Sequence, residues 1–217
     1  GMAEDAVGAI RGRGNRLDRR GVAISNYLIK MTDQELGDDE SHAVTELLNF
    51  VTEFERIGDY AVNIMEKAEE LNEKEASFSE SAQKELILLE KAVERILTVT
   101  GEAFEGDDTQ KAMQVEPLEE VIDVMVERLR DQHIRRLKDG VCSIDTGVVF
   151  LDVLNNVERI SDHCSNVAVR MIGMEGGEDY DSHTLKSIMH HNPTKDYMLE
   201  YEQCRKEYLV PLEQMEA

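Results

Sequence analysis

The sequence predicts an all-α protein, and three observations support this prediction. The chain of 217 residues is 41% hydrophobic but only 5% aromatic, lacks Trp and contains only three Pro. Ala, Leu, Glu, Met and Val, most of which favour helices, supply much of the sequence. Apolar residues recur at spacings of three and four over several long stretches, which is the pattern of helices with one buried face.

Two helices are expected in the N-terminal third of the chain. The pattern becomes regular from Arg16 and predicts a helix to about Lys30, whereas the glycines before it weaken the helical signal. Gly37 and the acidic residues that follow it mark a break and the start of the next helix. That helix is the clearest in the chain, because its apolar positions form one continuous face from Ala43 to Leu71.

Two more helices are expected in the middle of the chain. Ser77 and Glu80 have the spacing of a capping box and predict a helix that ends near Gly106. Another helix is expected from about residue 108 to residue 140, with a bend at Pro117 because proline removes a helical hydrogen bond.

The C-terminal part of the chain is expected to contain one long helix and two short ones. The expected elements are a long helix over 145–173, a Gly- and acid-rich linker over 173–181, and short helices over 182–190 and 194–209.

A nine-residue motif occurs twice, at an offset of 103 residues. Residues 55–63 read Glu-Arg-Ile-Gly-Asp-Tyr-Ala-Val-Asn and residues 158–166 read Glu-Arg-Ile-Ser-Asp-His-Cys-Ser-Asn, with five identical positions. An internal repeat of this period indicates two copies of one helical unit. In each copy an acid, a second acid and an amide stand at i, i+4 and i+8, so they share one stripe on the shoulder of the apolar face.

The repeat divides the chain into three expected parts. These are a first unit over residues 1–75, a second unit over 76–175 and a C-terminal helical extension over 176–217. The first unit shows two clear helices where the second shows three, which would leave apolar surface uncovered. We therefore expect the two terminal helices to pack against residues 15–75.

Carboxylates gather beside the apolar face of the second unit. Glu116, Glu119 and Asp123 lie within about 60° of one another on a helix. If that helix packs antiparallel to the next, these acids face Glu158 and Asp162. Neighbouring carboxylates repel one another unless a cation lies between them, and oxygen ligands suit Mg²⁺, Mn²⁺ and Fe. The pattern therefore predicts a metal site between the two helices.

A plainer interpretation is a solvated stripe of Glu–Arg pairs, each worth about 0.5 kcal/mol or less. The duplication of the motif on the same shoulder favours a site. No His has a Glu three residues before it, which argues against a di-iron oxidase, and His133 and His163 are expected at the surface or behind the ligands. A metal-dependent hydrolase would need a general base that the sequence does not identify.

The charge of the chain excludes some classes of partner. A formal net charge of −22 argues against nucleic acid and against direct binding to an anionic lipid surface. Residues 1–30 are an exception, since six basic and three acidic residues give them a charge of +3. No apolar run reaches the roughly 18 residues of a membrane span, and three widely spaced cysteines suit a reducing compartment. We expect a cytoplasmic protein.

The two motifs resemble the signature of the PhoU family of phosphate-signalling proteins, over about residues 15–173. The second unit and the terminal segment are more similar to the PhoU-like cytoplasmic tail of bacterial sodium/phosphate cotransporters. The resemblance implies tandem three-helix-bundle repeats, the first one incomplete, plus a C-terminal helical pair. It implies a regulator of phosphate uptake, not an enzyme, that contacts a membrane phosphate transporter at the inner membrane; homodimerisation is left open. The alternative is a stand-alone PhoU-type adaptor of a phosphate ABC transporter and its sensor kinase.

The resemblance also implies bound metal, a divalent or ferric ion such as Fe, Mn, Mg or Zn. The implied ligands are Asp18, Glu55 and Asp59 in the first unit and Glu116, Glu119, Asp123, Glu158, Asp162 and Asn166 in the second. In the first unit, two positions that match middle-helix acids of the family hold Gly14 and Arg11 instead. We therefore expect the second site to bind metal better than the first.

Overall fold

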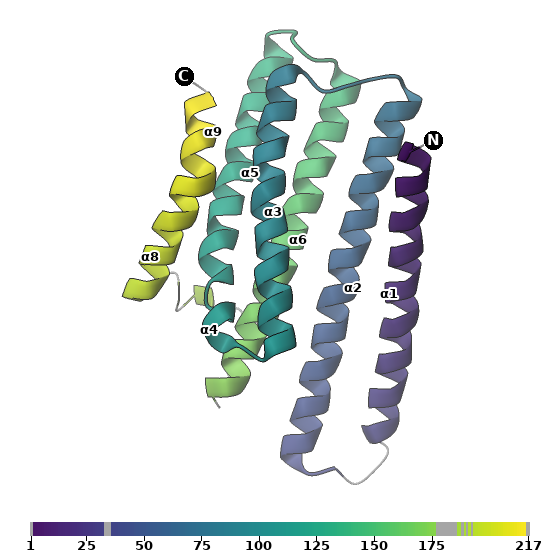
Figure 1. The fold of residues 1–217 in the computed structure, drawn as a ribbon, viewed down its shortest axis with the longest axis vertical. Helices are drawn as coiled ribbons and strands as arrows, with labels where there is room; N and C mark the ends of the chain where they lie inside the picture. The colour runs from purple at the N-terminus through teal and green to yellow at the C-terminus, as the bar shows by residue number, and fades with distance from the viewer. Residues whose placement is uncertain are drawn as a thin grey trace.

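The protein is a bundle of long helices (Figure 1). The computed structural model describes residues 2–32, 36–176 and 193–215, and also residues 186, 187, 189 and 191. Its elements are α1 (Met2–Thr32), α2 (Asp38–Glu73), α3 (Glu80–Gly106), α4 (Thr109–Ala112), α5 (Val115–Lys138), α6 (Ile144–Gly176), α8 (Lys195–Cys204), the π-helical turn η1 (Arg205–Leu209) and α9 (Val210–Met215). The predicted all-α class is confirmed. No described helix is long and apolar enough to cross a membrane.

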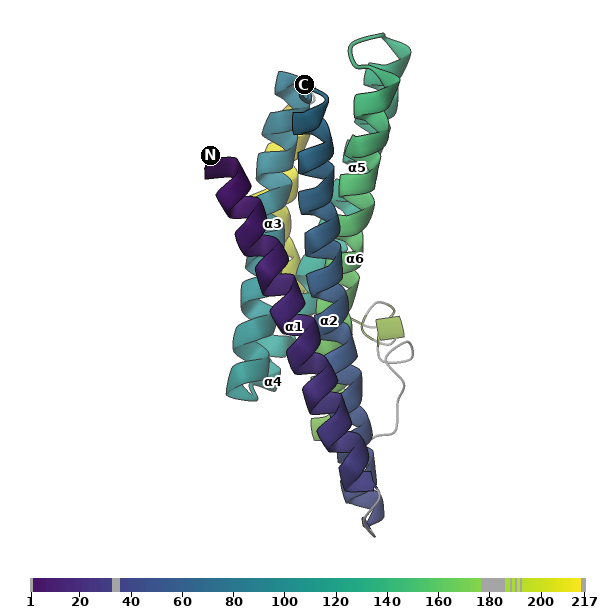
Figure 2. The ribbon, with the colours of Figure 1, turned by 90° about the vertical axis from the view of Figure 1, so that its right-hand side faces the viewer.

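The core lies among α3, α5 and α6, which correspond to the expected second unit. Its largest fully buried side chains include Leu89, Ile96, Leu118, Ile122, Met125, Leu129, Phe150 and Leu154. Helix α2 packs against the outer side of α6, and α1 lies beyond α2 at the edge of the bundle (Figures 1 and 2). Helix α6 therefore packs against α3 and α5 of its own unit on one side and against the α1–α2 hairpin on the other.

Local sequence signals explain where several helices begin. The backbone N–H of Gly37 donates to Glu40 Oε2 at 3.0 Å, which satisfies a free amide at the start of α2. Helix α3 is capped by Ser79, whose Oγ accepts from the amide of Ala82 at 3.3 Å. The cap is thus Ser79 and not Ser77, because only Ser79 directly precedes the first helical residue.

The helix expected over 108–140 is two helices. The short α4 ends at Ala112, and α5 begins at Val115. Pro117 is the third residue of α5, a position where the backbone N–H has no helical partner, so proline costs no hydrogen bond there. The expected bend at Pro117 was wrong, and the break lies just before α5.

Two helix ends differ from the expected ones. Helix α1 begins at Met2 and not near Arg16, and α6 continues to Gly176, beyond Gly173. Packing against α2 outweighs the low helix propensity of the early glycines in α1. Most of the predicted linker and of the helix over 182–190 lies outside the described residues.

Helices α8 and α9 and the turn η1 pack against α3 and α5, so the expected position of the helix over 194–209 on residues 15–75 was wrong. Leu209 and Leu212 enter the core of the second unit, and Arg128 of α5 pairs with Glu213 at 2.9 Å. An amphipathic segment of this length fits any exposed apolar face, which is why the sequence did not identify its partner. The first unit keeps a two-helix arrangement.

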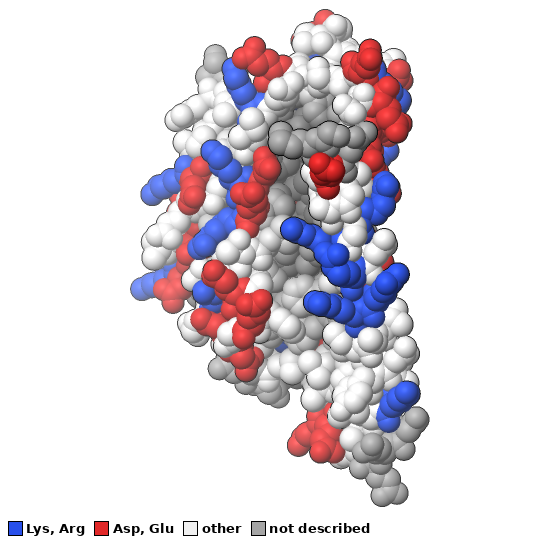
Figure 3. Space-filling view, turned by 45° about the vertical axis from the view of Figure 1, so that its right-hand side comes forward, with Lys and Arg blue, Asp and Glu red and all other residues white. Residues whose placement is uncertain are grey.

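Helices α1 and α2 approach closely at two glycines. A Cβ at Gly58 would overlap the side chain of Leu17, and a Cβ at Gly21 would overlap the carboxylate of Glu55. The absence of these side chains therefore sets the spacing of the hairpin. Arginines are frequent along the exposed part of α1, and Figure 3 shows basic side chains gathered beside a hollow on the face that includes this helix.

Candidate functional site

The two copies of the motif lie side by side where α2 of the first unit packs against α6 of the second. Helices α2 and α6 run antiparallel (Figure 1) and are joined by polar contacts along their length. These contacts are Arg170 Nη1 to Glu46 Oε2 at 3.1 Å, Asn63 Nδ2 to Asn156 Oδ1 at 3.2 Å, and Lys67 Nζ to Asp152 Oδ2 at 2.8 Å. This register brings most of the first motif beside most of the second, with Asn63 reaching Asn156 just outside it, an arrangement that the internal repeat does not specify.

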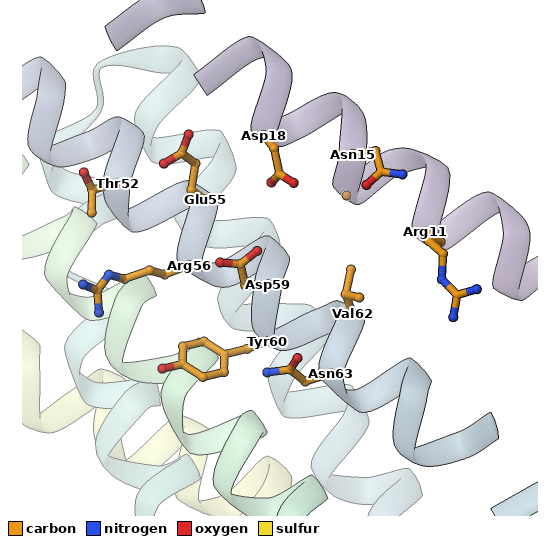
Figure 4. A pocket seen from close by; sticks show the side chains of 11 residues that line it. Arg11, Asn15, Asp18, Thr52, Glu55, Arg56, Asp59, Tyr60, Val62 and Asn63 are labelled. Carbon is orange, nitrogen blue, oxygen red and sulfur yellow. The ribbon is translucent and has the colours of Figure 1, made fainter. Parts of the chain in front are cut away.

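The acids of the first motif face α1. A cavity of about 620 Å³ lies between α1 and α2, and Asp18, Glu55 and Asp59 are among the residues that line it. The carboxylates of Asp18 and Asp59 point toward one another across this cavity (Figure 4). Glu55 lies in the space that a side chain at Gly21 would occupy. The structure thus brings together the three acids that were expected in the first unit.

The acids of the second motif are electrostatically coupled to α5. Burial raises the pKa of Glu119 to about 8, and the charges of Glu116 and Asp123 add to this effect. Burial also raises the pKa of Asp123 to about 6, followed by the charges of Asp162 and Glu158. One oxygen of Asp123, Oδ1, is buried without a hydrogen-bond partner in the described part of the chain. The expected crowding of carboxylates between α5 and α6 is therefore present.

Arginines hold both motif acids of the second unit. Arg130 Nη2 donates to Glu158 Oε2 at 2.9 Å, and Arg159 Nη1 donates to Asp162 Oδ2 at 3.3 Å. These pairs offset part of the negative charge, so the two carboxylates do not lie unpaired against Asp123. Such half-exposed pairs are weak, on the order of 1 kcal/mol or less, and a competing cation can open them.

Two other expected ligands have partners outside this acidic groove. Glu116 is buried and accepts a hydrogen bond from the hydroxyl of Ser165. The amide of Asn166 donates to Glu53 Oε2 of α2 at 3.2 Å, so Asn166 connects the two units. Glu116 nevertheless adds to the negative potential at Glu119 and Asp123, and Asn166 lines a cavity together with Asp162.

The carboxylates of both acidic grooves are chemically suited to a metal ion. Their side chains, as the structure places them, are not gathered around one point. Among the residues that the structure describes, no three His, Cys, Asp or Glu side chains lie close enough to hold an ion together. The raised pKa values of Glu119 and Asp123 nevertheless indicate a negative potential that a cation would neutralise. The carboxylate oxygens are donors of the kind that Mg²⁺ and Mn²⁺ prefer. A bound metal would require Glu158 and Asp162 to turn from their arginines.

Sequence reasoning missed the residue that anchors the boundary between the units. Glu53 lies within the apolar face of α2 and is buried in the structure. The signal available in the sequence was an acidic residue at a position of this face, where acids are rare. His163 Nδ1 lies 2.6 Å from Glu53 Oε2. Burial acts to raise the pKa of Glu53, but hydrogen bonds from His163 and Asn166 and the charge of Arg170 outweigh it, so the pKa is lowered. Glu53 is thus an ionised acceptor, and His163 donates through Nδ1.

The other histidine of the second unit is also buried. His133 stacks on Phe150 with ring centroids 4.7 Å apart, and burial lowers its pKa. Both histidines were expected at the surface or behind the ligands. Neither lies at the surface: both are buried, and each stacks on an aromatic ring, which is Tyr60 in the case of His163.

Comparison with known proteins finds a family model that matches more than half of this chain. The PhoU domain model matches residues 3–68 and 86–171. The phosphate-specific transport system accessory protein PhoU homolog 1 of Thermotoga maritima is 28% identical over 136 residues, which are 63% of this chain and 58% of the relative. A PhoU homolog of the same description from Streptococcus pneumoniae is 26% identical over 64% of this chain and 62% of its own length. The chain therefore spans about three fifths of these curated relatives.

Solved structures show the same fold. The structure of PhoU from Pseudomonas aeruginosa aligns with a TM-score of 0.73 and 18% identity, over 79% of this chain and 82% of that one. The PhoU regulatory protein of the phosphate transport system from S. pneumoniae aligns with a TM-score of 0.68 and 22% identity, over 82% of each chain. At these identities the likeness concerns the arrangement of helices.

Proposed function

We propose a function for this protein from one premise: the chain belongs to the PhoU family. The proposed function is that of an accessory protein that regulates phosphate uptake by contacting a membrane phosphate transporter, without turning over a substrate. The names of the relatives from T. maritima and S. pneumoniae, which are accessory proteins of phosphate-specific transport systems, support this proposal. Its place of action would be the cytoplasmic face of the membrane.

These relatives favour the stand-alone adaptor over the tail of a sodium/phosphate cotransporter, because they are named for phosphate-specific transport systems. The coding sequence upstream of Met2 separates the two forms. A continuation into hydrophobic spans would identify the cotransporter form, and its absence in the gene would identify the adaptor.

The observation that supports regulation most directly is the antiparallel pairing of the two motifs on α2 and α6. Each motif contributes acids to a groove on the outer side of its own helix and polar contacts to the shared boundary. A change in cation occupancy of either groove would alter the spacing of α2 or α6 from its neighbour. The buried hydrogen bond between Glu53 and His163 would transmit the resulting helix displacement to the other unit.

Metal ions are part of this proposal. Asp18, Glu55 and Asp59 would hold an ion in the first groove, and Glu119, Asp123, Glu158 and Asp162 would hold one in the second. The ion would supply positive charge that compensates the carboxylates. The protein's own side chains fix the distance between the helices that carry these acids, and they exclude water from the inner side of α5.

Phosphate uptake in cells tests the function. The chain is expressed with a phosphate-specific transporter in a strain that lacks its own PhoU-type accessory protein, and uptake of labelled phosphate is measured at low and high external phosphate. We expect the chain to restrict uptake at high phosphate, and Asp59→Asn together with Asp162→Asn to weaken that restriction. Uptake that is identical with and without the chain would refute the regulatory role. Phosphatase activity with added Mn²⁺ would instead favour a metal-dependent hydrolase.

A further inference from the structure

A second cavity lies at the boundary between the units, beside the acidic grooves and lined by basic residues. It has a volume of about 510 Å³ and is lined by Arg56, Tyr60, Arg159, Asp162, His163, Asn166 and Lys186. Three of these seven residues are cationic in a chain whose formal net charge is −22. Positive charge concentrated in this way within an acidic protein indicates an anionic ligand.

The internal repeat accounts for the two arginines. Arg56 and Arg159 occupy the second position of their respective motif copies. Antiparallel pairing of α2 and α6 brings the two copies together, so the same motif position supplies a guanidinium from each side of one cavity. Arg56 and Tyr60 point to the same side of α2, away from α1 (Figure 4). The motif thus supplies an arginine to the shared cavity from each of the two helices.

The cations of this cavity are only weakly engaged. Arg56 is exposed and makes no ion pair with another described residue. Arg159 meets Asp162 at 3.3 Å, and Lys186 Nζ lies 3.6 Å from Glu119 Oε1. Neither pair has the short, two-pronged geometry that fixes an arginine or lysine in place. Both side chains can therefore reorient toward a ligand in the cavity.

The cavity also has a polar wall that includes a hydrogen-bond acceptor. His163 lines the cavity, and its Nδ1 lies 2.6 Å from Glu53 Oε2 of α2. The ring is held in place by stacking on Tyr60, with centroids 5.6 Å apart. The carboxylate of Asp162 supplies the acceptor at the wall of the cavity. A fully ionised anion gains nothing from this carboxylate, whereas an anion that carries an O–H group can donate to it.

We propose that this cavity binds inorganic phosphate. At neutral pH phosphate is a tetrahedral anion that keeps one or two protons, so it can accept from the arginines and Lys186 while it donates to the carboxylate of Asp162. Sulfate has the same shape but no proton to donate, and the carboxylate of Asp162 would repel it. A carboxylate of this kind rejects an analogue that lacks the matching donor more strongly than cations alone can.

The proposed phosphate site lies between the two acidic grooves. It shares Arg56 and Tyr60 with the cavity of the first groove, and it shares Asp162 with the second groove. A phosphate that engages Arg159 would release Asp162 from its ion pair. The inference deepens the proposed function by naming what the site would sense, but phosphate binding to the purified chain is measured without a transporter. Failure of the phosphate site would therefore leave the transporter proposal standing, and the reverse also holds.

Calorimetric titration of the full chain with inorganic phosphate tests the proposal. EDTA is present throughout to exclude phosphate bound through a metal, and choline chloride holds the ionic strength constant. The test variant combines Arg56→Gln with Arg159→Gln. The matched control combines Arg19→Gln with Arg20→Gln, which removes the same charge from exposed positions on α1. Circular dichroism confirms that each variant is folded, and ³¹P NMR line broadening provides a second measure of binding.

We expect saturable binding of phosphate to the wild-type chain, a loss of affinity of at least tenfold in the test variant, and a change of less than twofold in the control. Sulfate is expected to bind at least tenfold more weakly than phosphate, and Asp162→Asn should narrow that difference. The absence of saturable phosphate binding in EDTA would overturn the proposal. An equal loss of affinity in the control, or equal affinity for sulfate and phosphate, would also overturn it. Tighter binding of phenyl phosphate than of inorganic phosphate would show that the cavity takes a phosphoryl group on a larger molecule and would refute the free-anion assignment.

Discussion

His163 of α6 and Glu53 of α2 form a buried hydrogen bond of 2.6 Å that joins the two units. Two further side chains contact the carboxylate of Glu53. The amide of Asn166 also donates to it, and Arg170 Nε lies 3.9 Å from its other oxygen, Oε1. A carboxylate that accepts several hydrogen bonds at a helix boundary holds that boundary in one register. The register in turn decides which residues of the two motifs meet.

Replacement of Glu53 by Gln should destabilise the chain at pH 7 by about 1–3 kcal/mol, because it removes the ionised acceptor from a buried site. The folded-state pKa of Glu53 lies below its ordinary value of 4.5, so its stabilisation is present above that value and is lost as the pH falls through the folded-state pKa. Urea unfolding at pH 7 and pH 3.5 measures both effects. The control Glu66→Gln, at an exposed position of the same helix, should change neither the stability at pH 7 nor its dependence on pH.

The acids of α5 should produce the opposite pH dependence. Glu119 and Asp123 bind protons more tightly in the folded chain, with pKa values of about 8 and 6. Their contribution is favourable at low pH and is lost as the pH rises through these values, so the free energy of unfolding should fall by roughly 2–4 kcal/mol between pH 5 and pH 8.5 without divalent metal. Glu119→Gln combined with Asp123→Asn should abolish most of this fall, and the exposed Glu127→Gln should preserve it. A wild-type stability that rises over this range would contradict the assignment.

Mn²⁺ should raise the thermal midpoint of the chain more at pH 8 than at pH 5.5, because metal and protons compete for the same carboxylates. Asp162→Asn should reduce the shift more than Asp59→Asn, since the second groove contains more acids. Metal content of the purified variants, measured by mass spectrometry, gives an independent readout. Equal occupancy of the two grooves would contradict the expected ranking, and an unchanged metal content in both variants would refute the ligand roles.

The buried ion pair between Arg136 and Glu85 offers a prediction about stability alone. The two side chains meet at 2.7 Å, and the guanidinium lies 5.5 Å from the ring centroid of Phe150. Removal of one partner by Glu85→Ala should cost about 3–5 kcal/mol, because an uncompensated charge is left in the interior. The apolar pair Glu85→Leu with Arg136→Met should cost much less, as denaturant unfolding can determine. Comparable costs for both variants would show that shape, and not charge, dominates at this site.

The spacing of α1 and α2 should depend on Gly21. An alanine at this position would displace the carboxylate of Glu55, so Gly21→Ala should lower stability by about 1–2 kcal/mol and weaken metal binding in the first groove. Gly8→Ala is the matched control, since no atom lies within 4 Å of its added Cβ. The control should gain up to about 1 kcal/mol from improved helix propensity. Thermal unfolding of both variants distinguishes packing from propensity.

The helices and the motif were predictable because they rest on short-range properties. Apolar spacing along α2 and α6 defines one buried face each, and the repeated motif places its acids on a shoulder of that face. Fine boundaries were harder to predict. The cap at Ser79 and the break before α5 depend on which of several similar polar residues adjoins the first helical turn, a choice that local sequence leaves nearly even in energy.

The sequence by itself determined that the chain is helical, that it contains two related units and that each unit bears a stripe of acids. The tertiary structure decided how these stripes are used. Packing of Leu209 and Leu212 on the second unit, and not on the first, follows from the shape of the available apolar faces. The pairing of Glu158 with Arg130 follows from the antiparallel packing of α6 against α5. The position of Arg56 and Arg159 in one cavity follows from the antiparallel packing of α6 against α2. Contacts between residues a hundred positions apart depend on how complete helices pack, and no periodicity within one helix encodes that arrangement.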